Sequence, residues 1–328
     1  MTRKSSVQRV YKSALRGLSA VMNGVRDESL QHGIRKALPP VVRTPLRKLA
    51  LRLTFEAQVA SRVDRQTILL ADFVRCGIGW IRFTVSTVLH YHRTGEFRKL
   101  AHAEMYVYTP TLTGRERPYR PFYFNGGESL LKTHDNFHPS FKRAIVIYRN
   151  PFDAIRSMYA LDHLEAKGSP YARLAGLSDE ESYLVERVRE YIGFHETWLT
   201  PICAHPDLYL VIEYEEMLGS TEAMLTAIFD FLKIDVTSLP SAGLATLARM
   251  YQRTDVTRPL IAEQVGLEEA IRRKLEMFRA IQPVMRRETL HRIDPALEAH
   301  LLDVVARMDG VRWRVEEPLA IGSGVADD

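Results

Sequence analysis

The sequence predicts an α/β fold in which helices cover both faces of a central, mainly parallel sheet. Three short apolar runs with the length of buried strands occur at 67–73, 144–148 and 208–212. Each run is followed by a segment with helical character, and strands that alternate with helices favour a parallel sheet. The chain has 328 residues, 46% of them apolar and 26% charged. This composition excludes collagen, low-complexity disorder and a disulfide miniprotein.

The first 65 residues are expected to form a basic helical extension. Between 7 and 25 the apolar residues recur at helical spacing, and Arg9, Lys12 and Arg16 fall on the opposite side. Residues 1–65 hold 14 Lys and Arg against 4 Asp and Glu, whereas the other residues hold 31 against 36. The net charge of +5 therefore comes from this segment. We divide the chain into an extension, 1–65, and a domain, 66–328.

The amphipathic basic extension suits an anionic membrane surface. The alternatives are an ordinary helix docked on the domain or on a second subunit of a homo-oligomer, and a cleaved organelle-targeting peptide. No stretch reaches the roughly 18 uncharged apolar residues that a spanning helix needs, so we expect a cytoplasmic protein with peripheral membrane association. A basic surface interleaved with aromatic side chains is not evident, and nucleic acid is not an expected partner.

The first candidate site is the turn at 75–79, which lies between the strand at 67–73 and a helix from Trp80 to about His90. Free backbone N–H groups and the positive end of the helix attract phosphate or sulfate, and Arg75 adds a fixed charge. The Walker and Rossmann patterns are both absent, so an NTPase or a dehydrogenase is unsupported. The alternative is a merely structural turn.

The second candidate is the pair Lys132 and His134. A histidine beside a lysine suits a general base next to a cation that stabilises developing negative charge. The alternative is a pair of surface residues on a loop. The preceding segment, 94–128, is rich in Tyr, Pro, Gly and Arg, and we expect it to be irregular and to face the substrate.

The third candidate follows the strand at 144–148. Asn150 is expected to cap a helix that begins with the next residue, a proline. Arg149 lies at the carboxyl end of the strand, where open α/β sheets bind ligands. Ser157 lies two helical turns further along, so a guanidinium and a hydroxyl can converge on one anion. The alternative role for Arg149 is an ordinary ion pair.

The rest of the chain continues the alternation of strands and helices. We expect a polar excursion at 161–182, a helix at 183–199, the third strand at 208–212 and an amphipathic helix at 220–232. The remainder is expected to be mostly helical. Two cysteines, Cys76 and Cys203, lack the spacing of a zinc or redox motif.

Four motifs, in this order, resemble the PAPS-dependent sulfotransferase family, in its bacterial form. They are Phe73-Val-Arg-Cys-Gly-Ile-Gly-Trp-Ile81, Lys132-Thr133-His134, Arg149-Asn-Pro-Phe-Asp-Ala-Ile-Arg-Ser157 and Tyr214-Glu-Glu-Met-Leu218. The resemblance implies a fold similar to that of nucleotide kinases. It also implies transfer of a sulfuryl group from 3′-phosphoadenosine 5′-phosphosulfate (PAPS) to an acceptor hydroxyl, with release of adenosine 3′,5′-bisphosphate and without a metal.

The resemblance also implies a role for each residue of these motifs. The implied donor-binding residues are Arg75, Cys76, Gly77, Ile78, Gly79, Trp80, Arg149 and Ser157. Within this set, Arg75 and the 76–79 backbone would hold the 5′-phosphosulfate, Trp80 would lie near the adenine, and Arg149 and Ser157 would bind the 3′-phosphate. The implied catalytic residues are His134, Lys132 and Arg75. Of these, His134 would be the base and Lys132 would contact the sulfuryl group.

The phosphosulfate turn departs from the family pattern at two positions. Gly79 replaces a threonine and Cys76 a serine, which removes side-chain hydrogen bonds worth about 1.5–3 kcal/mol each. The C-terminal motif Arg-x-Gly-x-x-Gly-x-Trp is not found, and Arg253 and Arg258 are the candidates to replace it. These departures support an alternative function, a non-catalytic nucleotide-binding protein on the same fold. A thiol nucleophile at Cys76 is a further alternative.

The acceptor is expected to be a glycan, a glycolipid or a small molecule with a hydroxyl group. The segment 104–124 is both aromatic and basic. Aromatic rings stack on sugar or lipid surfaces, and basic side chains suit anionic acceptors.

Overall fold

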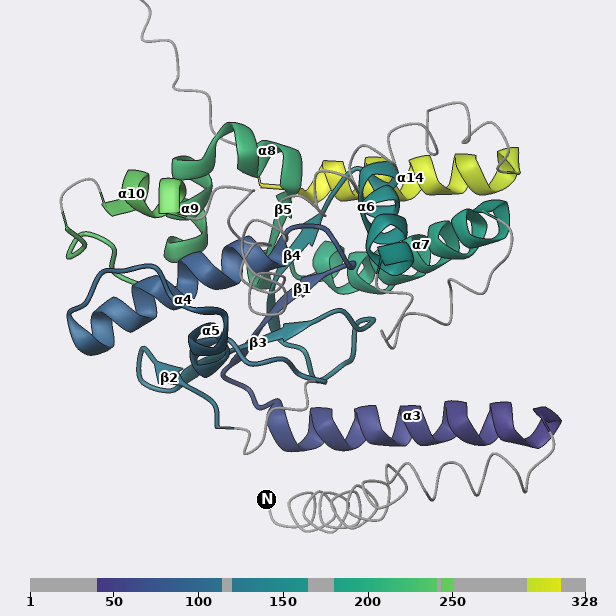
Figure 1. Ribbon diagram of the computed structural model, residues 1–328, viewed down its shortest axis with the longest axis horizontal. Helices are drawn as coiled ribbons and strands as arrows, with labels where there is room; N and C mark the ends of the chain where they lie inside the picture. Colours follow the sequence, from purple (N-terminus) through teal and green to yellow (C-terminus); the bar gives the residue numbers. More distant parts are fainter. Residues whose placement is uncertain (1–39, 114–119, 165–179, 241–242, 251–293, 314–328) are drawn as a thin grey trace, which may run out of the picture.

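A five-stranded sheet lies at the centre of the molecule (Figure 1). The computed structural model describes residues 40–113, 120–164, 180–240, 243–250 and 294–313. The strands are β1 (Thr67–Asp72), β2 (Tyr123–Phe124), β3 (Glu128–Thr133), β4 (Arg143–Tyr148) and β5 (Tyr209–Glu213). Their order is β2-β3-β1-β4-β5, and all neighbours run parallel except the edge strand β2. The predicted α/β fold with a mainly parallel sheet is confirmed.

Helices cover both sides of this sheet. They are α3 (Pro40–Arg62), α4 (Ile78–Thr94), α5 (His102–Tyr108), α6 (Pro151–Leu164), α7 (Glu180–Ala204), α8 (Tyr214–Gly219), α9 (Thr221–Phe231), α10 (Gly243–Met250), α14 (Pro295–Val311) and the short 3₁₀ helix η1 (Pro206–Leu208). Figure 1 shows α6, α7 and α14 on one side of the sheet, and α4, α9 and α10 on the other. In the described part of the chain, no helix is both long and apolar enough to cross a membrane.

The core is built around β1, whose six residues are all buried. Its neighbours contribute Leu130 and Leu131 from β3 and the apolar stretch 144–147 from β4, all at 1% exposure or less. Strands with helices on both faces bury both rows of side chains, which is why these segments are continuous apolar runs rather than alternating ones. The three strands predicted from those runs are confirmed to within one residue at each end.

The segment 94–128 is more regular than expected, because it contains α5, β2 and the start of β3. Strand β3 was not predicted, since only Leu130 and Leu131 carry its apolar signal. The turn before β3 is formed by Asn125 and Gly126, with φ of 45° and 78°. An Asn-Gly pair with positive φ is typical of a tight hairpin turn and is the signal that could have located β3. Lys132 therefore lies on a strand of the sheet and not on a loop.

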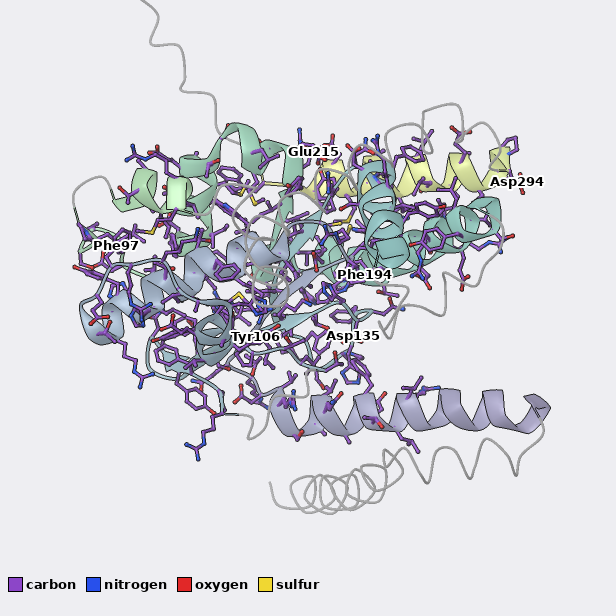
Figure 2. All side chains as sticks on the ribbon, viewed as in Figure 1. Phe97, Tyr106, Asp135, Phe194, Glu215 and Asp294 are labelled. Atoms are coloured by element: carbon purple, nitrogen blue, oxygen red, sulfur yellow. The ribbon has the colours of Figure 1, made fainter. Side chains whose placement is uncertain are left out.

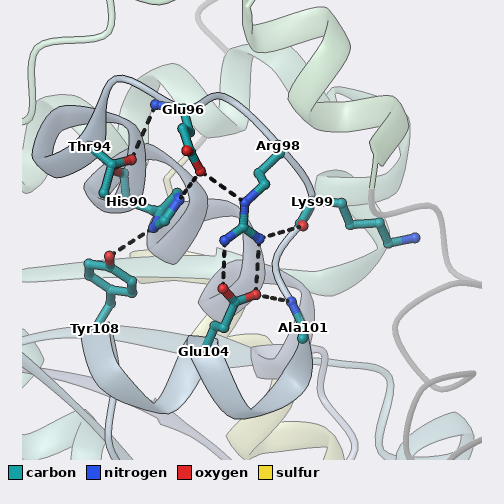
Figure 3. A network of polar contacts seen from close by, with 8 residues as sticks. All are labelled: His90, Thr94, Glu96, Arg98, Lys99, Ala101, Glu104 and Tyr108. Atoms are coloured by element: carbon teal, nitrogen blue, oxygen red, sulfur yellow. Dashed lines mark hydrogen bonds and ion pairs between the residues drawn. The ribbon is translucent and has the colours of Figure 1, made fainter.

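A polar network joins α4 to α5 (Figure 3). Arg98 donates to both carboxylate oxygens of Glu104, at 2.6 and 3.0 Å, and the Ala101 N–H donates to the same carboxylate at 2.7 Å. The hydrogen bonds from Arg98 are the main reason why the pKa of Glu104 is lowered to about 2. Nδ1 of His90 lies 2.9 Å from the Tyr108 hydroxyl. The network holds α5 against α4 and so fixes the segment that follows α5.

Helix α3 is attached to the domain through its carboxyl end. Arg62 donates to the carbonyl oxygens of Thr111 and Leu112, both at 2.8 Å. Glu56 lies 3.2 Å from Nε2 of His138. The amphipathic helix expected at 7–25 lies outside the described residues.

His195, on α7, is a fully buried histidine of the core. Its ring packs against Phe73 and Tyr191, and Nδ1–H donates to the Tyr191 carbonyl at 2.8 Å. Burial disfavours the charged imidazolium and lowers the pKa of His195 to about 4. The residue is therefore neutral in the folded protein near pH 7.

In the unfolded chain His195 binds a proton below about pH 6.5, whereas in the folded chain it does so only below about pH 4. The free energy of unfolding therefore decreases as pH falls through this window. We expect the wild type to lose about 2 kcal/mol more stability than His195→Gln between pH 7 and pH 5. Urea unfolding of both proteins at the two pH values measures the difference. Equal losses would contradict a neutral buried His195.

Candidate active site

The candidate residues gather at the carboxyl ends of the parallel strands. Register places Asp72 of β1 opposite Ile147 of β4, and Ala71 opposite Thr133 of β3. The three strands therefore end at the same edge of the sheet. The turn at 73–77, His134 and Arg149 follow those ends directly, at the edge where open α/β sheets bind ligands.

The turn after β1 leads into α4 through backbone with positive φ. Arg75 has φ of 75° and Gly77 has φ of 105°. Helix α4 begins at Ile78, and the residue before it, Gly77, has no side chain that could cap it. The first N–H groups of a helix have no partner within it. One of them, the Ile78 N–H, donates to Oδ2 of Asp72 at 3.4 Å. A helix start favours anions, and the use of this one as an anion site stays a prediction.

Gly77 is required by the close approach of Tyr214, the first residue of α8. A Cβ at Gly77 would lie 2.4 Å from Cδ2 of the Tyr214 ring. The guanidinium carbon of Arg149 stands over the same ring, 4.5 Å from its centroid. Tyr214 therefore contacts the glycine turn and Arg149 together.

Arg75 connects Arg149 to Ser157, the two residues that the sequence predicts to converge on one anion. Arg75 donates from Nε to Oγ of Ser157 at 3.0 Å, and Arg149 donates from Nη1 to the Arg75 carbonyl at 3.1 Å. Arg149 is 8% exposed. Its Nε makes no hydrogen bond within the described residues and lies 3.6 Å from a Glu215 oxygen. Their assignment to the 3′-phosphate and the phosphosulfate stays a prediction.

The turn after β4 is fixed from two sides. Oδ1 of Asn150 accepts from the N–H groups of Phe152 and Asp153, at 3.0 and 3.4 Å, which confirms the predicted cap of α6. The Tyr191 hydroxyl donates to the Arg149 carbonyl at 2.7 Å from α7. The Arg149 carbonyl is thus bonded to α7, and the next residue caps α6.

Both ring nitrogens of His134 have close polar neighbours. Its Nε2 is in contact with Nζ of Lys132. Its Nδ1 lies 2.6 Å from Oδ1 of Asp72 and 3.0 Å from the Asp72 carbonyl oxygen. Asp72 is completely buried, whereas 29% of the His134 side chain is exposed. Asp72 was not predicted as a site residue, although an acid inside an apolar strand, directly before a glycine turn, is an unusual residue that needs a partner.

Helix α7 supports the loop that carries His134. Trp198 donates from Nε1 to the carbonyl oxygen of Asp135 (labelled in Figure 2) at 3.3 Å. The Phe137 N–H donates to Oγ1 of Thr197 at 3.0 Å. Burial raises the pKa of the Asp135 carboxyl above its usual value. The position of His134 therefore depends on packing against α7.

The backbone of 109–112 lies alongside Lys132. The Lys132 N–H donates to the Pro110 carbonyl at 2.9 Å, and the Leu112 N–H donates to the Lys132 carbonyl at 2.8 Å. Of the aromatic residues expected to contact the acceptor, Tyr108 is buried and packs on Phe122 at 4.7 Å between ring centroids. Tyr108 belongs to the core and the partly buried Phe122 packs against it, while Tyr123 is 55% exposed.

Three further residues near the site, Cys76, Trp80 and His138, have structural environments that account for them. Burial is the main cause that raises the pKa of Cys76 well above its usual value, and the Asp72 charge adds to it. Cys76 is therefore a thiol and a poor nucleophile. Trp80 is half-buried against the core. His138 is bonded to Glu56 and to the Ser140 N–H, and the described residues contain no group of three side chains suited to hold a metal.

A family model described as the sulfotransferase domain matches residues 65–254, more than half of the chain. The chain belongs to the sulfotransferase family. Among solved structures, mouse sulfotransferase SULT7A1 complexed with PAP aligns with 77% of this chain and 88% of its own, at 15% identity and a TM-score of 0.46. No curated protein matches the chain. Family membership supports sulfuryl transfer, and hence an acceptor with a hydroxyl group.

The contact between Gly77 and Tyr214 leads to a test with two glycines. Gly77 and Gly95 both have positive φ, but only Gly77 has a neighbour within 4 Å of an added Cβ. We expect Gly95→Ala to lower stability by about 1 kcal/mol through backbone strain. Gly77→Ala should lower it by about 2–5 kcal/mol, because the Tyr214 ring must also move. Denaturant unfolding gives both values, and equal losses would contradict the close approach.

The two cysteines should differ in reactivity, because Cys76 is buried and Cys203 is exposed. We expect iodoacetamide at pH 8 to modify Cys203 alone in the folded protein and both residues in urea. Mass spectrometry of the peptides reads this out, with Cys203→Ser as the control that leaves no fast site. Rapid modification of Cys76 in the folded protein would restore the nucleophile hypothesis.

Proposed function

We propose that the chain transfers a sulfuryl group from PAPS to the hydroxyl of a glycan, a glycolipid or a small molecule. The observation that carries the proposal is the convergence of groups at one sheet edge. The start of α4, three cations and a histidine held by a buried carboxylate meet there. The three cations are Arg75, Lys132 and Arg149. We also propose that residues 1–65 form an extension to the 66–328 domain, on which the carboxyl end of α3 docks.

The side chains at this edge fit the two anionic ends of the donor. Arg149 has a buried Nε without a hydrogen-bond acceptor, so a 3′-phosphate held with Ser157 would supply one. The backbone of 76–79 and the Arg75 guanidinium would hold the 5′-phosphosulfate, and Trp80 would lie beside the adenine. When bound, PAPS supplies a sulfuryl group activated by its anhydride bond to phosphate.

The residues of the site would act by positioning and electrostatics, as in phosphoryl transfer. The acceptor oxygen bonds to sulfur, and the bond from sulfur to the bridging oxygen breaks with its electron pair left on the phosphate. His134 takes the acceptor proton at Nε2, and Lys132 offsets the charge on the sulfuryl oxygens. Because Lys132 occupies Nε2 in the structure, its ammonium must move from the base to the donor. The scheme uses side-chain cations and no metal.

Two histidines four residues apart provide a test of this proposal. We expect His134→Ala to lower kcat by about 10²–10⁴-fold and to leave PAPS affinity nearly unchanged, because the base acts on the acceptor. The matched control is His138→Ala. This variant loses the polar contacts to Glu56 and Ser140 and the ring contacts to Phe55 and Phe141, and it should keep both values. Release of adenosine 3′,5′-bisphosphate with a panel of hydroxyl acceptors gives kcat, and calorimetry gives the affinity.

A third variant tests the donor site. Arg149→Ala should weaken PAPS binding by about 10–100-fold, which corresponds to the loss of a hydrogen bond to a charged group. Folded wild-type protein that does not bind PAPS would overturn the proposal. Binding without turnover of any acceptor would favour the non-catalytic alternative.

A further inference from the structure

We propose that Asp72 is a positioning residue for the reaction: its carboxylate holds His134 in the tautomer that acts as a base and stabilises the imidazolium that forms. The inference rests on the proposed function of His134. The inference is argued from the contacts of the Asp72 side chain, which is fully buried at the end of β1.

The burial of Asp72 is difficult to explain by stability alone. The five residues before it in β1 carry no charge, and all six are buried. A carboxylate in such surroundings loses its hydration, and buried ion pairs seldom stabilise a fold more than apolar side chains of the same size would. An acid at this position therefore indicates a role in the site that it faces.

The two carboxylate oxygens of Asp72 have different partners. Oδ2 accepts from the Ile78 N–H, at the start of α4, at 3.4 Å. Oδ1 lies 2.6 Å from Nδ1 of His134. One side chain thus connects the turn proposed to hold the donor with the base proposed to activate the acceptor. This connection sets the distance between the imidazole and the helix start.

The partners of His134 assign its tautomer from both sides. Nδ1 faces two acceptors, the carboxylate and the carbonyl oxygen of Asp72, so it carries the proton. Nε2 is in contact with the Lys132 ammonium, which has only protons to donate, so Nε2 presents a lone pair. Nε2 is the nitrogen that must accept the proton of the acceptor hydroxyl. Once it does, the positive ring lies against the Asp72 carboxylate, as in the serine-protease triad.

The carbonyl and the carboxylate of Asp72 are separable by mutation. The Nδ1–H direction meets hydrogen-bond geometry at the carbonyl oxygen, and the closer Oδ1 lies off that direction. If the carbonyl alone oriented the ring, the side chain would be dispensable. The proposal requires that the charge of the carboxylate matters.

Asp72→Asn gives the sharpest test, because the neighbouring groups determine which way the amide oxygen and the NH₂ group of the new side chain point. The Ile78 N–H needs an acceptor, so the amide oxygen of the variant faces Ile78 and its NH₂ faces Nδ1 of His134. We expect the His134 proton to move from Nδ1 to Nε2. The ¹⁵N shifts of histidine-labelled protein report this tautomer without donor or acceptor, and His134→Gln assigns the resonance.

Turnover provides the second readout. We expect Asp72→Asn to lower kcat by about 10²–10⁴-fold and to leave the PAPS dissociation constant within about threefold. The matched control is Asp135→Asn, which changes a partly buried carboxylate one residue from His134 that is hydrogen-bonded to Thr133. It should keep the wild-type tautomer and kcat. An Asp72→Asn variant with unchanged tautomer and kcat would overturn the proposal.

The design separates this inference from the proposed function. If the wild type does not bind PAPS, the proposed function fails, whereas the ¹⁵N shifts still decide whether Asp72 sets the tautomer. Thermal unfolding checks that each variant folds. Should Asp72→Asn fail to fold, Asp72→Ser removes the charge without offering an amide, and its kcat at unchanged PAPS affinity decides in the same way.

Discussion

Strand β1 is hydrogen-bonded along both edges, to β3 and to β4, and this pairing determines where every candidate group lies. Because all three strands are parallel and in register, their last residues meet at one edge of the sheet. The glycine turn, the Lys132–His134 pair and Arg149 are far apart in the sequence but follow those last residues directly. A shift of β3 by one residue would turn Lys132 to the other face of the sheet.

Three cationic side chains and one buried carboxylate gather at this edge of the sheet. The cations Arg75, Lys132 and Arg149 lie where they can meet an anion, and each already contacts a neutral or acidic neighbour. Beneath them lies the buried Asp72, which faces the helix start and the imidazole. A few placed charges of both signs therefore create a polar site in a domain whose overall balance is slightly acidic.

The elements that were predicted correctly from the sequence have local signals. The strand at 144–148 and the Asn150 cap were predicted because apolar runs and capping residues act within a few positions. Strand β3 was missed because only Leu130 and Leu131 carry its apolar signal. The pairing of Asp72 with His134 was missed for another reason. The two residues are 62 positions apart, and their contact depends on the strand register, which no local pattern encodes.

Helix α7 gives the site a property that no single residue shows. The same helix donates from Tyr191 to the Arg149 carbonyl, and from Trp198 to the Asp135 carbonyl. It also receives the Phe137 N–H at Thr197. The turn that carries Arg149 and the loop that carries His134 are therefore both hydrogen-bonded to one helix. Proteins open locally in cooperative units, and residues in one unit share its opening free energy. An opening of α7 would release both halves of the site together, so the site forms and is lost as one cooperative unit.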